Sequence, residues 1–113
     1  MPIRADDVET LHLYAETVMG RVAHHAGSVG AVALALLGAI IWRAEPGSIA
    51  IRPYREKLGN VLDIVINGKK YSFRYDQQDQ AIEMRENDIS GPVVQTFSNS
   101  TALASVGTFF RGL

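Results

Sequence analysis

Histidine and carboxylate side chains are the groups most often used for metal binding and acid–base catalysis, and their spacing in this sequence favours neither. The three histidines are His12, His24 and His25. Two metal ligands on one helix usually stand four residues apart, whereas His12 and His24 would lie about 18 Å apart along a helix. No motif brings two acidic side chains to one cleft, and the sequence has no cysteine. The sequence therefore predicts no catalytic residue, no metal site and no cofactor.

A second group of residues has the composition of a small-molecule site, which combines aromatic surfaces with a few polar groups. The group consists of Trp42, Arg43, Arg52 and Tyr54. These residues lie on two segments, 39–44 and 48–54, that we expect to pair as a hairpin because Pro46-Gly47 between them suits the middle of a type II turn. We predict these four residues as a ligand-binding site. The alternative is that the two aromatic residues belong to the core or its rim.

The segment of residues 69–75, KKYSFRY, interleaves basic and aromatic side chains. The pattern superficially resembles the aromatic strand of an RNA-recognition motif. It lacks the glycine that the motif places after the first basic residue, and its aromatic spacing differs. The expected strand pairing also turns Tyr71 and Phe73 toward apolar partners. We therefore expect nucleic-acid binding to be disfavoured.

Charge is distributed unevenly along the second half of the chain. Residues 43–75 hold seven Lys and Arg against three Asp and Glu, a net charge of +4. Residues 76–88 hold one Arg against five Asp and Glu, a net charge of −4. One interpretation is that oppositely charged strands attract each other across a sheet. The other is a basic face that meets an anionic ligand or partner.

Two helices are expected before residue 38. Asp6 can cap the first helix, with Glu9 three residues further on as in a capping box. Apolar residues then recur every three or four positions as far as Val22. Ser28 can cap the second helix, residues 29–37, which is apolar on every side and must be buried on every side. Either the sheet and the first helix cover it, or a second copy of the chain does.

The uncharged stretch of residues 26–42 is short for a membrane span, which needs about 20 apolar residues. Its first part is rich in Ala and Leu, whereas residues 40–42 are Ile-Ile-Trp, which favour strands. Gly38 between these parts suits a helix C-cap. We predict a buried segment that changes from helix to strand at Gly38, with a continued helix and membrane association as alternatives. Because residues 1–9 lack the apolar region of a secretory signal, we expect a cytoplasmic protein.

Alternation of apolar and polar residues predicts strands from residue 39 onward. The clearest prediction is a hairpin in which Asn67-Gly68 forms a type I′ turn and Ile64 pairs with Tyr71. Ser98 or Ser100 is expected to cap a C-terminal helix. The other strands are expected at residues 39–44, 48–54, 81–86 and 92–97.

Strands that are bracketed by helices, rather than alternating with them, indicate an α+β fold with an antiparallel sheet. We predict a single domain over residues 1–113. It has two N-terminal helices, a sheet of five to six strands in meander order and one C-terminal helix, with the helices packed on one face of the sheet.

The composition is that of a globular protein, with 47% hydrophobic residues, 20% charged residues and a net charge of −1. There is more apolar helix than one small sheet needs. We therefore predict a self-associating binding or interaction protein with no assignable catalytic activity, and a homodimer because two-fold dimers are the commonest oligomers. The alternative is a small-molecule-binding protein, or an enzyme of undetected type, with a pocket between helices and sheet. In its compact, motif-poor format the chain is similar to proteins encoded by mobile gene cassettes.

Overall fold

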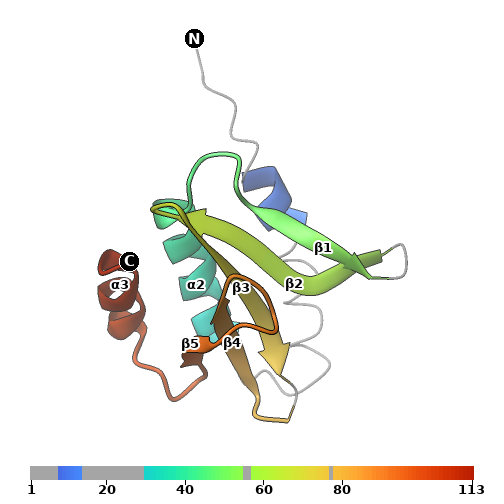
Figure 1. Cartoon of the computed structure of the whole chain (residues 1–113). Helices are drawn as coiled ribbons and strands as arrows, with labels where there is room; N and C mark the ends of the chain where they lie inside the picture. Colours follow the sequence, from blue (N-terminus) through green and yellow to red (C-terminus); the bar gives the residue numbers. More distant parts are fainter. Residues whose placement is uncertain (1–7, 14–29, 55–56, 77) are drawn as a thin grey trace.

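The computed structural model describes residues 8–13, 30–54, 57–76 and 78–113, and for residues 53, 54 and 57–60 it describes the backbone alone (Figure 1). Residues 8–13 are helical. The later elements are α2 (Gly30–Arg43), β1 (Ala50–Tyr54), β2 (Lys57–Ile66), β3 (Lys69–Asp76), β4 (Ala81–Glu86), β5 (Val93–Phe97) and α3 (Leu103–Arg111). The fold is α+β, as predicted.

The five strands form one antiparallel sheet in the order β1-β2-β3-β4-β5. The predicted β2–β3 hairpin is confirmed, because Ile64 lies opposite Tyr71 and Leu62 lies opposite Phe73. Asn67 and Gly68 have φ angles of 53° and 82°, and a type I′ turn requires positive φ at both positions. The turn and the apolar alternation therefore set the same register.

Helices α2 and α3 lie on one face of the sheet, next to each other (Figure 1). The core is formed where their buried faces meet the alternate residues of β2, β3 and β4. Phe110 of α3 stacks on Phe73 of β3, with ring centroids 6.4 Å apart. Phe97 lies 6.3 Å from Phe110, so the C-terminal helix is held to the sheet by an aromatic cluster.

The predicted strand at residues 39–44 is wrong, because α2 continues through Gly38 as far as Arg43. The buried residues of α2 have helical spacing on both sides of Gly38: they are Val32, Ala33, Leu36, Ala39 and Ile40. Packing of this face on the sheet outweighs the strand preference of Ile-Ile-Trp. In the described residues no helix combines the length and hydropathy that crossing a bilayer requires.

Pro46-Gly47 does form a turn, but the turn joins α2 to β1 and not two strands. The Ser48 N–H donates to the Glu45 carbonyl at 3.0 Å, and Gly47 has a φ of 78°, as position three of a type II turn requires. The Glu45 N–H donates to the Val65 carbonyl. Strand β1 consequently pairs with β2, and the predicted pairing of residues 48–54 with residues 39–44 does not occur.

The helix caps also differ from the prediction. The residue that precedes α3 is Ala102, with no side-chain cap, so neither Ser98 nor Ser100 caps this helix. Ser98 and Ser100 instead bond to each other in the preceding turn, at 2.8 Å. The helical residues 8–13 fall within the predicted first helix. Its remaining residues and the expected cap at Ser28 lie outside the described part of the chain.

Candidate functional site

The four residues predicted to bind a ligand lie in two places. Trp42 and Arg43 end α2, whereas Arg52 lies in β1 and pairs with Asp63 on the sheet face that points away from α2. Tyr54 is in β1, and its side chain is outside the described part of the structure. The structure therefore brings Trp42 and Arg43 together but does not bring Arg52 to them, because the hairpin that was expected to join the two segments is absent.

Trp42 lies between two arginines at the C-terminal ends of α2 and α3. The guanidinium carbon of Arg43 is 5.7 Å from the indole centroid, and that of Arg111 is 5.9 Å from it. The Arg43 Nη2 atom donates to the Leu113 carbonyl at 2.5 Å. Cations near helix C-termini are stabilised by the helix dipole. These contacts give both arginines a structural role, and 53% of Trp42 stays exposed.

Ionic contacts link neighbouring strands on the sheet face that the helices leave open. The Asp63 carboxylate of β2 accepts hydrogen bonds from Arg52 Nε, at 2.7 Å, and from the Ser72 hydroxyl. Lys70 Nζ of β3 lies 3.8 Å from the same carboxylate. Asp63 is 9% exposed and Ser72 is 1% exposed, so this buried carboxylate is satisfied by partners from both sides.

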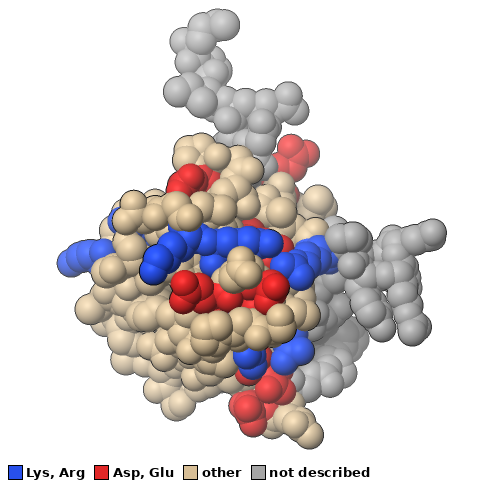
Figure 2. All heavy atoms as spheres, in the orientation of Figure 1, with Lys and Arg blue, Asp and Glu red and all other residues tan. Residues whose placement is uncertain are grey.

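A second carboxylate has the same kind of surroundings further across the sheet. Glu83 of β4 lies 3.1 Å from Arg74 and 3.2 Å from Arg85. Arg85 also donates to the Gly91 carbonyl at 2.8 Å. Figure 2 shows the basic and acidic side chains next to each other across the middle of this face. The contacts favour the interpretation in which adjacent strands attract each other.

Among the described residues, Arg52 and Asp88 have pKa values that depart from the ordinary ones. The hydrogen bond to Asp63, followed by its negative charge, raises the pKa of Arg52. The Ser90 hydroxyl and backbone N–H both donate to Asp88 Oδ1, at 2.7 Å and 2.9 Å, and lower the pKa of Asp88. Both shifts favour the charged form. Neither group is thereby set up for proton transfer near neutral pH.

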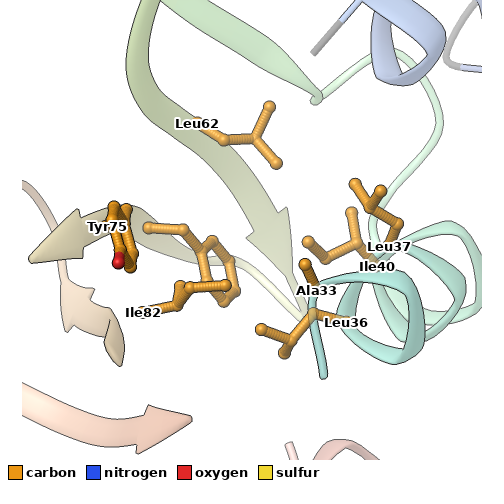
Figure 3. Close-up of a pocket in the computed structure, with 8 residues that line it drawn as sticks. Ala33, Leu36, Leu37, Ile40, Leu62, Tyr75 and Ile82 are labelled. Carbon is orange, nitrogen blue, oxygen red and sulfur yellow. The ribbon is translucent and has the colours of Figure 1, made fainter. Parts of the chain in front are cut away.

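A cavity lies between α2 and the helix-covered face of the sheet (Figure 3). The cavity has a volume of about 30 Å³ and is partly open to solvent. Four lining residues come from α2 and four from β2, β3 and β4: Ala33, Leu36, Leu37, Ile40, Leu62, Phe73, Tyr75 and Ile82. The lining is apolar apart from the Tyr75 hydroxyl.

Sequence reasoning did not single out these cavity residues. The signal for the α2 half was present, since residues 33, 36, 37 and 40 have the spacing of one helix face. The predicted break at Gly38 divided that face between a helix and a strand. The sheet half depends on how β3 and β4 lie against α2, which spacing along the chain does not give.

The opposite side of α2 is lined by apolar residues, with Arg43 and Arg111 beside Trp42 at its C-terminal end. Leu34, Ile41 and Trp42 are 57%, 51% and 53% exposed. Ala31, one turn before Leu34, and Gly38, between Leu34 and Ile41, are also exposed. A Cβ atom added to Gly38 would meet nothing within 4 Å. We call these five residues the outer α2 stripe. A buried stripe of this kind on a helix is ordinary, whereas an exposed one is typical of an interaction surface.

Comparison with known proteins gives a family but no characterised relative. A comparison with curated proteins found no match. The model of a family described as "Integron cassette protein VCH_CASS1 chain" matches residues 11–107, which cover the sheet, α2 and most of α3. The expected origin in a mobile gene cassette is therefore confirmed: the chain belongs to this family of integron cassette proteins.

Proposed function

We propose that the protein is a non-catalytic interaction protein that associates with a second copy of itself through the outer α2 stripe. The observation that carries the proposal is the exposure of Leu34, Ile41 and Trp42 on one helix. Burying such an apolar surface away from water lowers the free energy of the system. A partner for it must itself be apolar over about the same length. The same stripe on a second copy meets that requirement without any further component.

The positions of the exposed residues favour a crossing near Gly38. Leu34 precedes Gly38 by about one turn, and Ile41 and Trp42 follow it by about one turn. When two copies cross antiparallel at Gly38, Leu34 of each copy lies opposite Ile41 of the other. The missing side chain at Gly38 lets the two backbones approach closely at the crossing. Three large side chains make a small interface, so we expect a dissociation constant on the order of micromolar or weaker.

Sedimentation velocity over a range of protein concentrations tests the proposal. We expect the wild-type chain to show a concentration-dependent rise in sedimentation coefficient, and Leu34→Glu to remain monomeric, because the dimer would bury an unpaired charge. Ile89→Glu is the matched control, since Ile89 is an exposed apolar residue outside α2. It should associate like the wild type.

Two outcomes would contradict self-association through this stripe. The first is a wild-type chain that stays monomeric up to millimolar concentration. The second is a dimer that Leu34→Glu weakens no more than Ile89→Glu does. In both cases circular dichroism should first establish that each variant is folded, which we expect because both side chains are already exposed.

A further inference from the structure

We infer that the cavity between α2 and the sheet is a binding site for the end of a linear alkyl chain with a neutral polar head, such as a primary alcohol. This inference goes beyond self-association, because the cavity lies on the side of α2 that faces the sheet. Its lining comes from α2, β2, β3 and β4. Apolar pockets with few polar groups are the usual form of small-molecule sites.

The small size of the cavity favours a narrow ligand. Its volume is only about 30 Å³, and it is open to solvent. A chain of methylene groups can enter so small a space, whereas a ring is wider and would have to push apart the lining side chains, among them Leu36 and Ile82 on opposite sides (Figure 3). Interiors resist such displacement because they are close-packed. An apolar cavity of this kind also holds water poorly, so little is lost when a chain enters.

Tyr75 determines the nature of the polar end. It is the single lining residue with a polar side-chain group, and it is only partly buried. In the described part of the chain its hydroxyl has no hydrogen-bond partner. A ligand hydroxyl at the mouth can donate to this oxygen or accept from it. No cation lines the cavity in the described residues, so a carboxylate head would lose water contacts without gaining a counter-charge.

The probes for this site are n-octanol and n-octanoate, which share a chain and differ in the head. Two-dimensional NMR titration should show saturable shifts with n-octanol at residues on both sides of the cavity, and at least tenfold weaker binding of n-octanoate. Ala33→Leu extends a buried side chain into the narrow space, and should weaken n-octanol binding at least tenfold. Ala104→Leu makes the same change on the exposed side of α3 and should leave binding unchanged.

A second variant guards against misfolding of Ala33→Leu. Leu37→Phe enlarges a partly buried residue at the cavity and should also weaken n-octanol binding. Tyr75→Phe should weaken the binding of n-octanol by removing its hydrogen-bond partner, and should bring the affinity for n-octanol nearer to that for n-octanoate.

Shifts that do not saturate, or equal binding by wild type, Ala33→Leu and Leu37→Phe, would overturn the site. Equal binding of both probes would overturn the neutral head. Repeating the n-octanol titration with Leu34→Glu, which we expect to be monomeric, shows whether binding in the cavity depends on self-association.

Discussion

Gly38→Ala is the substitution for which the structure gives the sharpest paired expectation. Gly38 lies inside α2, and a Cβ at this position would meet nothing within 4 Å. Alanine should therefore fit without strain, and it removes the entropic disadvantage of glycine in a helix, about 1 kcal/mol. For a chain of 113 residues this gain corresponds to a rise in Tm of roughly 4 °C.

The same substitution should weaken the proposed dimer. If two copies of α2 cross at Gly38, each added methyl group lies where the backbones are closest, and the helices must move apart. We expect the association constant to fall several-fold while the free energy of unfolding of the monomer rises. Urea denaturation followed by circular dichroism at low protein concentration measures the unfolding, and sedimentation velocity measures the association.

Gly107→Ala is the matched control, because Gly107 lies inside α3 and a Cβ there also meets nothing within 4 Å. It should raise stability by a similar amount without changing association. A loss of stability in Gly38→Ala would contradict the expectation that a methyl group at position 38 meets no neighbouring atom. A gain in stability with association unchanged would refute the crossing at Gly38, although another part of the stripe would still be available.

The remaining predictions concern stability and titration. Asp63→Ala should lower the free energy of unfolding by about 1–3 kcal/mol, because the buried Ser72 hydroxyl loses its acceptor; a neutral effect in urea denaturation would contradict this. Phe110→Ala should cost about 3–5 kcal/mol, because it leaves a cavity beside Phe73, and a loss below 1 kcal/mol would show that the aromatic cluster is not part of a packed core. Ser90→Ala should raise the pKa of Asp88 in an NMR titration, because the hydroxyl donates to the carboxylate. Since the folded chain lowers this pKa, Asp88 stabilises the fold above its ordinary pKa and the contribution is lost as the pH falls through the lowered value; an unchanged titration curve would show that the hydroxyl has no such effect.

The β2–β3 hairpin could be predicted because all of its determinants are local. Asn67-Gly68 selects the turn type, the turn selects the register, and the register places Leu62 opposite Phe73. The strand of residues 81–86 was predicted with its observed bounds for the same reason, since its alternation and its flanking turns lie within a few residues. In both places short-range preferences and burial agree.

The end of α2 could not be read in this way because local preference and burial disagree there. Ile40, Ile41 and Trp42 favour strands, and Gly38 resembles a helix stop. Yet Ala39 and Ile40 continue the buried face that begins at Val32. The contact with the sheet decides the outcome, and the sheet lies later in the chain. The error also placed Trp42 and Arg43 near Arg52 in the predicted site.

The cavity shows a different limit of sequence reasoning. Its α2 half could have been found from helical spacing across Gly38, but a cavity is space that side chains leave unfilled. That space depends on how far α2 stands from β3 and β4, and on how Leu36, Tyr75 and Ile82 are oriented. Residue types along the chain do not fix those distances.

The position of α3 after all five strands in the chain order has a consequence for biosynthesis. Residues that lie 70 positions apart, Arg43 and Leu113, meet only when this helix docks. The meander of neighbouring strands can assemble while the nascent chain is still emerging, because each pairing needs only a short loop. Phe73 and Phe97 remain uncovered until α3 has left the ribosome. We therefore expect a chain truncated before Leu103 to aggregate, because the aromatic residues that α3 covers would stay exposed.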